Sequence, residues 1–486
     1  MCEHCIADAI LSAGNAPGGS GGAGPQSAGG TGISSFQVGF SGTDQSNMLA
    51  LVGTSKWNSN ALTFSFPDQT SDYTGSPGSY GSGELTSGFT SLNAAQKTAA
   101  RTAFDLIEEY TPLTITEITG AQGSADMRLA QSAVPSTAWA YYPGSNTGGD
   151  SWFGTGSSYY TNPARGTYAG HTFLHEIGHA VGLKHGHDNS GYGSLDNATD
   201  QMPYSVMTYS SYAGSGGGGY TNEYYGYAQT YMIFDIAALQ AIYGVNWSTR
   251  SDATTYTWSS TTGEMSVNGV AQGAPASNRV FSTIWDGGGD DTIDLSNYSN
   301  DITGSIAPGS YLSFSQMQTA QLGAGIFADG NVYMALAPDN KKKAYIENLI
   351  TGQGDDFVFG TTKANSMEGR GGSDRLEGKG GDDILSGGGG RDLLIGGPGD
   401  DILFGGIGKD SLKGSGGADI FQMDDRSGKD VAVDFVLGMD RVDVPDNNLA
   451  TLITSNTAHL TIEYMGSWMI LRGLNPGDAT LNEILL

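Results

Sequence analysis

The sequence predicts two consecutive structured domains, an α+β domain with a twisted sheet and then an all-β domain of the parallel β-roll or sandwich type. Three observations lead to this expectation. Strand-like and helical apolar patterns are mixed before residue 249. A helical stretch over residues 170–185 carries four histidines. Beyond residue 249 helical patterns vanish, and a glycine- and aspartate-rich unit recurs every nine residues. We therefore expect a flexible leader over residues 1–50, the first domain over 51–248 and the second over 249–486.

Charge and composition exclude several classes of partner. The chain has 486 residues, with 50 acidic and 22 basic side chains and a formal net charge of −28. This excess argues against nucleic acids and anionic membranes as partners, and it suits hard cations bound by carboxylates. We find no run of about 18 apolar residues that could span a membrane. The N-terminus lacks a basic segment followed by an apolar core, so no Sec-type signal peptide is visible.

Residues 1–50 are rich in glycine, serine and alanine, a composition that predicts a flexible leader or propeptide. The two cysteines of the chain, Cys2 and Cys5, both lie in this segment, so the domains carry no disulfide framework. The pair could bind a metal, or its thiolate could inhibit a catalytic metal, but a flexible end without a catalytic role is the simpler interpretation. A latent zymogen held by residues 1–50 is a further alternative.

Order in the first domain is expected to begin near Trp57. Asn93 is a candidate N-cap for a helix that Pro112 closes. Strands are expected over 61–66, 113–118, 125–129 and 138–142, and helices over 93–110 and 234–244. This mixture suggests a twisted sheet with the histidine-bearing helix packed beneath it.

The most informative stretch reads His175-Glu176-x-x-His179-x-x-Gly182-x-x-His185. His175 and His179 are four residues apart, so they share one face of an α-helix and can bind one zinc ion together. Glu176 can stay off the metal and still reach a water that the metal activates. On a continuous helix His185 would lie roughly 15 Å farther along the axis, so the helix must stop. It can stop at Gly182, because glycine accepts the left-handed conformation at a helix C-terminus.

Three protein ligands and one open position are typical of catalytic zinc. The extended pattern is identified as the metzincin motif. The simpler interpretation is a helix with several surface histidines, which the eleven-residue pattern disfavours. His171 lies four residues before His175 on the same face, but the three-histidine set is complete without it. Lys184 and His187 are expected to tune the site rather than to act directly.

Met207 lies 22 residues after His185, within the stretch Ser-Val-Met-Thr-Tyr. A methionine in isolation most often packs a core. Metzincins, however, carry a methionine turn under the zinc, and the position of Met207 resembles that turn. Tyr209, two residues later, is therefore expected near the metal.

The repeats of the second domain run over about residues 351–422 and share an acidic sixth and an apolar eighth position. The sixth positions are Asp356, Asn365, Asp374, Asp383, Asp392, Asp401, Asp410 and Asp419, and the eighth include Leu376, Leu385, Leu394, Leu403 and Leu412. Six residues make a turn that offers oxygens to Ca²⁺, and three make a short strand with its apolar side chain inside. Two units close one coil, so equivalent turns stack 18 residues apart. A disordered glycine-rich linker is the alternative, which the period disfavours. Without Ca²⁺ the carboxylates would repel one another, and the roll should be unfolded.

Taken together, the motifs resemble those of the serralysins, secreted bacterial zinc metalloproteases of the metzincin clan, over about residues 55–486. The resemblance implies zinc ligands His175, His179 and His185, a general base at Glu176, a turn methionine at Met207, and Tyr209 as a resting zinc ligand that stabilises the oxyanion. It implies a calcium site between the domains formed by Arg250, Asp252, Thr254, Asp286, Gly288 and Asp291. It also implies a substrate-binding edge strand at Ala138, Trp139, Ala140 and Tyr141. Two features depart from the family: the long glycine-rich leader with its cysteine pair, and Asp252 where glycine is expected.

The resemblance further implies a secreted endopeptidase with one catalytic Zn²⁺ and several structural Ca²⁺. Protein or peptide substrates, a proteinaceous inhibitor and a monomeric state go with this expectation. Residues 482–486, an acidic side chain followed by apolar ones, resemble the uncleaved signal of type I secretion, so that machinery is an expected partner. The alternative function is a calcium-dependent structural or adhesive exoprotein whose protease domain is inert.

Overall fold

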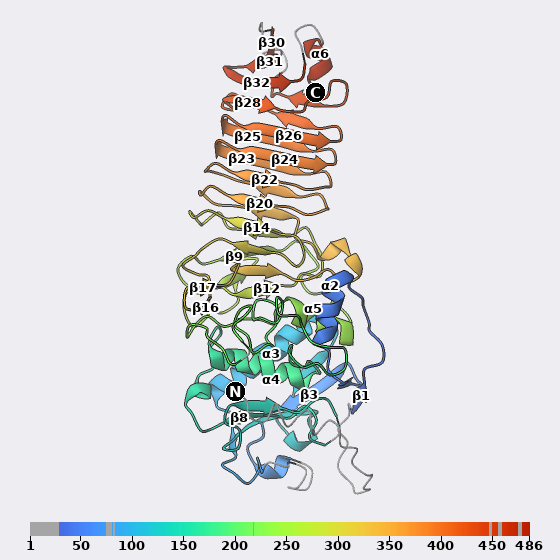
Figure 1. Cartoon of the computed structure of the whole chain (residues 1–486), viewed down its shortest axis with the longest axis vertical. Helices are drawn as coiled ribbons and strands as arrows, with labels where there is room; N and C mark the ends of the chain where they lie inside the picture. The colour runs from blue at the N-terminus through green and yellow to red at the C-terminus, as the bar shows by residue number, and fades with distance from the viewer. Residues whose placement is uncertain are drawn as a thin grey trace.

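The computed structural model describes residues 29–73, 80, 83–144, 146–216, 218–446, 450–454, 459–474 and 479–486. The molecule is long and narrow, with the first domain at one end and the C-terminus near the other (Figure 1). Cys2, Cys5 and the rest of the expected leader up to residue 28 lie outside the described residues. Across the described part of the chain, no helix combines the length and the apolar character needed to cross a bilayer.

The sheet of the first domain follows the order β5-β3-β6-β8-β7, and β4 pairs with β6 beside it. Its strands are β3 (Ala61–Ser65), β4 (Thr90–Ser91), β5 (Thr114–Glu117), β6 (Met127–Ser132), β7 (Ala138–Ala140) and β8 (Ser151–Gly154). β3, β5, β6 and β8 run parallel, whereas β7 runs antiparallel to β8 and stands at the end of the order. β3, β5, β6 and β7 correspond to expected strands. β8 was not expected, because it is buried throughout and its sequence shows no alternation.

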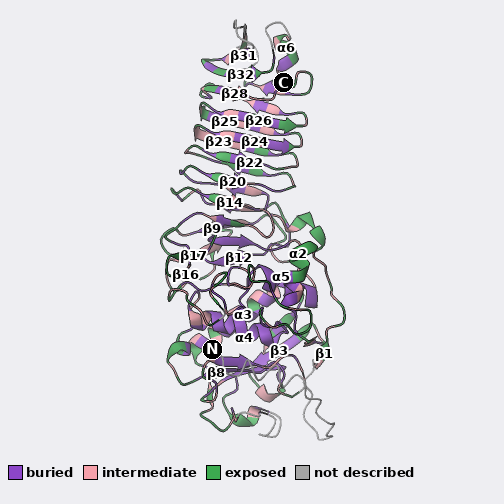
Figure 2. Cartoon of the chain, in the orientation of Figure 1, coloured by how far each residue is buried: buried purple, intermediate pink, exposed green. Residues whose placement is uncertain are grey.

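Three helices pack with this sheet. They are α3 (Ala94–Tyr110), α4 (Tyr168–Ala180) and α5 (Ile233–Tyr243). Asn93 caps α3 as expected, since its side chain accepts from the Gln96 N–H at 3.0 Å and its own N–H donates to the Gln96 side chain at 2.7 Å. α4 is buried along nearly its whole length (Figure 2). Phe173 of α4 stacks on Phe153 of β8 with ring centroids 4.0 Å apart, which confirms an α+β domain with the histidine helix against the sheet.

Residues 29–50 differ from the expected flexible leader. Their elements are β1 (Gly30–Gly32), which pairs antiparallel with β2 (Ser55–Trp57), and α2 (Gly42–Ala50), which packs on α5. Met48 and Ala50 are buried in the core of the first domain. The apolar residues at the end of the segment drive this packing, and the average composition of residues 1–50 hides them. The Lys184 N–H donates to the Leu51 carbonyl at 2.8 Å, so the segment also braces the loop that follows α4.

The second domain has two long sheets, and from β19 to β29 successive strands alternate between them. One has the order β11-β10-β9-β13-β19-β21-β23-β25-β27-β29, and the other has β12-β18-β15-β14-β20-β22-β24-β26-β28-β32-β31-β30. β16 and β17 form a separate hairpin. The strands are β9 (Thr255–Trp258), β10 (Met265–Val267), β11 (Val270–Ala271), β12 (Ser282–Ile284), β13 (Thr292–Asp294), β14 (Thr303–Ser305), β15 (Tyr311–Ser313), β16 (Gln321–Gly323), β17 (Ile326–Phe327), β18 (Val332–Met334), β19 (Asn348–Ile350), β20 (Phe357–Phe359), β21 (Ser366–Glu368), β22 (Arg375–Glu377), β23 (Ile384–Gly390), β24 (Leu393–Pro398), β25 (Ile402–Gly408), β26 (Ser411–Gly416), β27 (Ile420–Gln422), β28 (Lys429–Ala432), β29 (Arg441–Asp443), β30 (Ala450–Thr454), β31 (His459–Tyr464) and β32 (Ser467–Arg472).

From β19 to β29 each strand pairs in parallel with the strand two further along the chain. Arg375 pairs with Leu393, so one coil takes 18 residues. The leucines of the eighth repeat position are all fully buried between the two sheets, namely Leu376, Leu385, Leu394, Leu403 and Leu412. These features confirm the predicted β-roll. Its far end carries the antiparallel strands β30–β32 and α6 (Leu481–Ile484), where Ile484 is buried and the Leu486 N–H donates to the Val442 carbonyl at 3.0 Å.

Candidate active site and calcium ladders

The three histidines of the sequence motif converge on one point. Their Nε2 atoms lie 3.1 Å apart for His175 and His185, 3.2 Å for His175 and His179, and 3.0 Å for His179 and His185. All three side chains are buried. In a tetrahedral site with Zn–N bonds of about 2.0–2.1 Å, ligand nitrogens lie about 3.3 Å apart. The spacing therefore fits a zinc ion between the three nitrogens.

The other ring nitrogens explain how two of these rings are oriented. Nδ1 of His175 lies 2.8 Å from the Val206 carbonyl oxygen, and Nδ1 of His179 lies 2.7 Å from that of Leu183. A carbonyl only accepts, so Nδ1 carries the proton and Nε2 keeps its lone pair. Burial lowers the pKa of His175 to about 4 and moves the pKa values of His179 and His185 well below the usual range. Neutral imidazoles with converging lone pairs are the donor set that zinc takes.

The chain turns back after α4 to bring in the third histidine. α4 ends at Ala180, and Gly182 follows with φ +103°. A Cβ on Gly182 would also lie 2.7 Å from the Ser55 carbonyl oxygen, so both the conformation and the available space require glycine. This turn places His185 beside the two helical ligands.

Met207 packs directly against the histidine helix. The side chain is fully buried, and a Cβ on Gly178 of α4 would approach its sulfur to 2.8 Å. The Met207 carbonyl also accepts from the Gly186 N–H at 3.2 Å, next to His185. The structure thus brings the expected turn methionine beneath the helix, between the first two histidines.

Tyr209 lies beside the three nitrogens, and Glu176 lines the cavity that adjoins them. The Tyr209 hydroxyl is 2.9 Å from His185 Nε2, and its ring stacks on that of His175 at a centroid distance of 5.7 Å. Glu176 follows His175 on α4 and is only 5% exposed. His187 stacks on the outer face of the His185 ring at 5.1 Å. All the residues expected to bind zinc or to act in catalysis are therefore gathered at one place.

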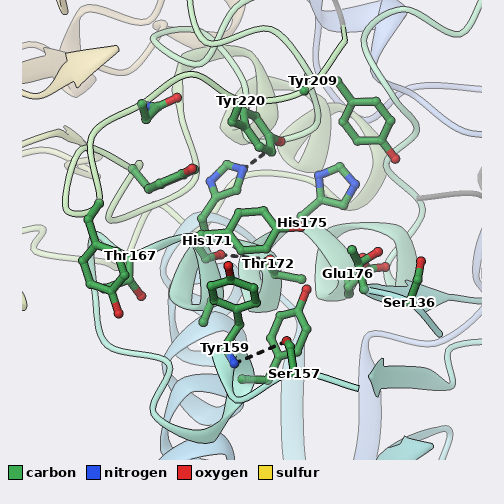
Figure 3. Close-up of a pocket in the computed structure, with 18 of the residues that line it drawn as sticks. Ser136, Ser157, Tyr159, Thr167, His171, Thr172, His175, Glu176, Tyr209 and Tyr220 are labelled. Atoms are coloured by element: carbon green, nitrogen blue, oxygen red, sulfur yellow. Dashed lines mark hydrogen bonds between the residues drawn. The ribbon is translucent and has the colours of Figure 1, made fainter. Parts of the chain in front are cut away.

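A cavity of about 660 Å³ opens beside this site (Figure 3). His175, Glu176 and Tyr209 form one wall of it. The remaining walls are largely aromatic and include Tyr159, Tyr160, Tyr168, Tyr220, Tyr224 and Tyr227. A cavity of this size accepts a large side chain of a ligand.

The expected substrate strand lies at the rim of the same cavity. Thr137, which directly precedes β7, lines the cavity. Ala138, Trp139 and Ala140 form β7 and are buried, and the hydroxyl of Tyr141 donates to the Glu84 carboxylate at 2.7 Å. The structure therefore places these four residues at the end of the sheet that faces the histidine site.

The acidic sixth positions of the repeats form a hydrogen-bonded ladder along each edge of the roll. In each ladder, Oδ1 of an aspartate accepts from the backbone N–H of the residue 18 positions earlier, over 2.7–3.0 Å. The other oxygen, Oδ2, is buried without a hydrogen-bond partner in Asp374, Asp383, Asp392, Asp401 and Asp410. A buried carboxylate oxygen without a donor is unfavourable, and a calcium ion would satisfy it.

The residues expected to bind calcium between the domains also lie together. The Asp286 carboxylate accepts from the Gly288 N–H at 2.8 Å, and Asp291 Oδ1 accepts from the Thr254 N–H at 2.8 Å. A Cβ on Gly289 would lie 2.6 Å from both the Asp252 carbonyl oxygen and Asp291 Oδ1. Burial and the neighbouring Asp286 raise the pKa of Asp291 to about 8, and its Oδ2 has no partner. These oxygens form a second environment suited to a cation.

Arg250 contributes to this region by its backbone position. Its φ of +49° is left-handed, and its guanidinium donates to the Glu109 carboxylate at 2.9 Å and the Trp285 carbonyl at 3.1 Å. The side chain is thus held by partners other than the acidic pair. This agrees with a main-chain role, as the resemblance implies.

Asn365 differs from the aspartates of the ladder. Its Oδ1 accepts from the Thr361 N–H at 2.6 Å, and its Nδ2 donates to the Glu347 carbonyl at 2.9 Å. One carboxylate oxygen of Glu347 accepts from the Asp291 N–H at 2.9 Å, and the other pairs with Lys363. Protein groups thus satisfy the side chains at this turn, and the open carboxylate oxygen of Asp374, Asp383, Asp392, Asp401 and Asp410 has no counterpart here. The geometry does not favour Asn365 as a calcium ligand.

Two family models match the chain, and together they cover both domains. The model described as Matrixin matches residues 85–192, which include α4 and the third histidine. The model described as Peptidase M10 serralysin C terminal matches residues 245–466, which include the roll. The chain is thus similar to matrixins in its first domain and to serralysins in its second.

Curated serralysins and related metalloproteases are similar over part of their length. Metallopeptidase AprA of Pseudomonas marginalis is 34% identical over 299 residues, which is 58% of this chain and 57% of the relative. Serralysin C of Dickeya chrysanthemi is 32% identical over 290 residues, which is 56% of this chain and 54% of the relative. The serralysin of Proteus mirabilis is 31% identical over 254 residues, or 49% of this chain and 44% of the relative. The chain spans about half the length of the curated relatives it matches.

Sequence reasoning missed a buried carboxylate that supports the histidine site. Asp235, in the first turn of α5, accepts from the Ser205 hydroxyl at 2.6 Å and from the N–H groups of Val206 at 2.7 Å and Met232 at 2.9 Å. Val206 in turn accepts from His175 Nδ1. Asp235 therefore supports His175, an expected zinc ligand, through the backbone of Val206. The available signal was an aspartate inside an otherwise apolar helix.

The ladders also extend beyond the residues that the period predicts. Asp430 accepts from the Asp410 N–H and Asp440 from the Asp419 N–H, both at 3.0 Å. They lie 20 and 21 residues after their partners, so a nine-residue period does not find them. Asp430 lies at the start of β28 and Asp440 directly precedes β29, and an aspartate at the start of a strand was the available signal.

Proposed function

We propose that the chain is a secreted zinc-dependent endopeptidase that hydrolyses peptide bonds and carries a calcium-stabilised roll. The convergence of the His175, His179 and His185 Nε2 atoms within 3.2 Å of one another is the observation that carries this proposal. Glu176 and Tyr209 line the adjoining cavity, which suits a peptide side chain. The relatives include a metallopeptidase and a serralysin, which supports the same reaction class.

In the proposed reaction Glu176 and Tyr209 have separate roles. A bound zinc ion would polarise the scissile carbonyl and lower the pKa of the attacking water toward about 7. Glu176 takes the proton from this water as general base and then delivers it to the leaving amine. Tyr209 would be a further ligand in the resting site, and its hydroxyl would stabilise the developing oxyanion, where a preorganised donor is worth several kcal/mol. No covalent intermediate is required.

The substrate is proposed to bind as an extended strand along β7. Backbone pairing with Ala138, Trp139, Ala140 and Tyr141 gives affinity without demanding a sequence. β7 stands at the end of the sheet, and Thr137 ahead of it lines the cavity beside Glu176. A peptide in this position would carry its scissile bond past Glu176 and place a neighbouring side chain in the cavity.

The roll is proposed to bind several structural calcium ions. The proposed ligands along its edges are Asp356, Asp374, Asp383, Asp392, Asp401, Asp410 and Asp419, together with Asp430 and Asp440. Between the domains they are the carboxylates of Asp286 and Asp291 and the backbone of Arg250, Asp252, Thr254 and Gly288. The unpartnered Oδ2 atoms of Asp291, Asp374, Asp383, Asp392, Asp401, Asp410 and Asp430 support this assignment. Asn365 is left out because protein groups satisfy its side chain.

Export is proposed to use a type I machinery that reads the acidic and apolar tail at residues 482–486. Residues 1–28 are proposed to belong to a proenzyme leader. Both proposals rest on the sequence and on the resemblance to the serralysins, which also admits a proteinaceous inhibitor.

A casein digest tests the proposed activity directly. The calcium-loaded chain, with and without residues 1–28, is compared before and after a zinc-selective chelator and again after zinc is restored. We expect digestion that the chelator abolishes and zinc restores. A calcium-loaded, zinc-replete chain that cleaves nothing in either form would instead support an adhesive protein with an inert protease domain.

A further inference from the structure

We propose that His171 is a positioning residue that holds Tyr209 in place through Tyr220. His171 lies on α4 one turn before His175, and it is 1% exposed. Its Nε2 lies 3.0 Å from the Tyr220 hydroxyl rather than with the three converging nitrogens (Figure 3). The proposal deepens the proposed function, on which it rests, because it concerns how the tyrosine beside the zinc nitrogens is held.

The direction of the first hydrogen bond follows from the second. The Tyr220 hydroxyl lies 2.5 Å from the Thr208 carbonyl oxygen, which can only accept. Tyr220 has a single hydroxyl proton, and it donates that proton to Thr208. His171 must therefore donate its Nε2–H to the Tyr220 oxygen. Burial raises the pKa of Tyr220 well above its ordinary value, so the hydroxyl keeps the proton that this chain of bonds needs.

Thr208 directly precedes Tyr209 and is held on two sides. Its hydroxyl donates to the Asp200 carboxylate at 2.5 Å and accepts from the Ser210 N–H at 3.0 Å. Its carbonyl is held by Tyr220. The peptide unit that carries Tyr209 is thus fixed by the side chain of Thr208 on one side and by the His171–Tyr220 relay on the other.

The rings support the same arrangement. The Tyr220 ring meets His171 edge-on at 5.2 Å and 86°, and it meets the Tyr209 ring at 6.4 Å and 83°. Tyr220 therefore contacts Tyr209 through both the backbone and the ring. Because the Tyr209 hydroxyl lies 2.9 Å from His185 Nε2, a small shift of its backbone changes its distance to the metal position. Loss of the His171 donor leaves the Tyr220 hydroxyl held only by the Thr208 carbonyl, and so loosens Tyr209.

Copper substitution gives a readout that a purely structural role would not change. In the full-length chain with Cu²⁺ in place of zinc, a tyrosine bound to the metal gives a phenolate-to-copper charge-transfer band. We expect this band in the wild type and in His171→Gln, whose amide N–H can donate to Tyr220. We expect it to fall at least twofold in His171→Ala and in Tyr220→Phe.

Tyr231→Phe is the matched control. Its hydroxyl donates to the Leu174 carbonyl of the same helix at 2.9 Å, on a buried path that does not reach Tyr209. Tyr231→Phe should lose about as much stability as Tyr220→Phe and should keep the phenolate-to-copper charge-transfer band. In the zinc forms, kcat of His171→Ala should fall about tenfold with KM within about twofold, less than the ~10²–10³ typical of removing an oxyanion donor itself.

The outcomes distinguish the His171–Tyr220 relay from the proposed role of Tyr209 as a metal ligand. A wild-type band that persists unchanged in His171→Ala and Tyr220→Phe overturns the relay and leaves the role of Tyr209 intact. A wild type without any such band contradicts Tyr209 as a metal ligand, and the relay falls with it. Equal loss of the band in Tyr231→Phe also overturns the relay, since the effect is then general.

Discussion

At the scale of single residues, the three converging histidines could be predicted from the sequence. The residue that supports one of them, Asp235, could not. The spacing of His175, His179 and His185 determines their geometry once a helix and a glycine turn are assumed, so local rules suffice. Asp235 lies 50 residues after His185 and acts through a backbone unit that only the folded chain brings to His175. Burial raises the pKa of Asp235 to about 7, despite three donors that favour its charged form. The three hydrogen bonds show that the backbone around Val206 depends on the Asp235 side chain.

Asp235→Ala should weaken both the fold and the zinc site. The change leaves the buried N–H groups of Val206 and Met232 without an acceptor, at about 1–3 kcal/mol each. We expect unfolding in urea at a clearly lower midpoint and zinc affinity about 10–100-fold weaker, as for other residues that orient ligands. Asp235→Asn is the matched control, because its amide oxygen still accepts from both groups. Wild-type stability and zinc affinity in the alanine variant would show that Asp235 does not support the site.

At the scale of the repeat, the nine-residue period predicted the interior leucines and the acidic ladders. It did not predict why each unit after the first, which starts at Thr351, begins with glycine. A Cβ on Gly396 would lie 2.0 Å from Asp401 Oδ2, so the missing side chain makes room for the carboxylate five residues later. The period also stops short of Asp430 and Asp440, because the loops before them are longer than a repeat. The ladder is therefore defined by hydrogen bonds between aspartates that are neighbours in space, and not by a fixed spacing in the sequence.

Gly396→Ala should weaken calcium-dependent folding of the roll. The new methyl displaces the Asp401 carboxylate, and overpacking of this kind costs about 1–3 kcal/mol. Gly416→Ala is the control, since a Cβ there meets nothing within 4 Å. Thermal unfolding across a calcium titration measures the effect, and we expect a higher calcium requirement for Gly396→Ala alone. Identical titrations for the two variants would rule out this role of the first glycine.

At the scale of the whole molecule, the order of the two domains and the β-roll followed from the sequence, but the start of the ordered chain did not. Averaged composition assigned residues 29–50 to a flexible leader, whereas Met48 and Ala50 lie in the core. The roll also differs along its length, because the turn at Asn365 is satisfied by protein groups and later turns carry open carboxylate oxygens. Calcium dependence should therefore be graded.

Calcium depletion should unfold the far part of the roll first. Hydrogen exchange measured with and without calcium should show protection lost from β22 to β29. The helices α3 to α5 should stay protected, since their hydrogen bonds do not depend on an ion. The strands β19 and β21 should stay protected as well, because Asn365, directly before β21, donates to the carbonyl of Glu347, directly before β19. Loss of protection in the first domain at the same calcium concentration as in the roll would contradict this order.

The calcium-free roll should lose stability as the pH rises. Burial raises the pKa of Asp374 to about 8, of Asp383 and Asp401 to about 7 and of Asp392 to about 6. The unfolded value is about 3.9, so the folded form binds protons more tightly and its stability falls between about pH 4 and 8. Exchange protection of β22 to β29 without calcium, corrected for intrinsic rates, should be greater at pH 5 than at pH 8. Calcium should remove this dependence, and a rise toward pH 8 without calcium would contradict it.

The central claim is that Glu176 performs proton transfer beside a zinc ion that three histidines hold without it. The decisive measurement is the zinc content and casein turnover of Glu176→Ala, purified with calcium beside the wild type. We predict about one zinc per chain in both proteins and turnover at least ~10²-fold lower in the variant, the usual range for removing a general base. A zinc-loaded variant with wild-type turnover would contradict the account.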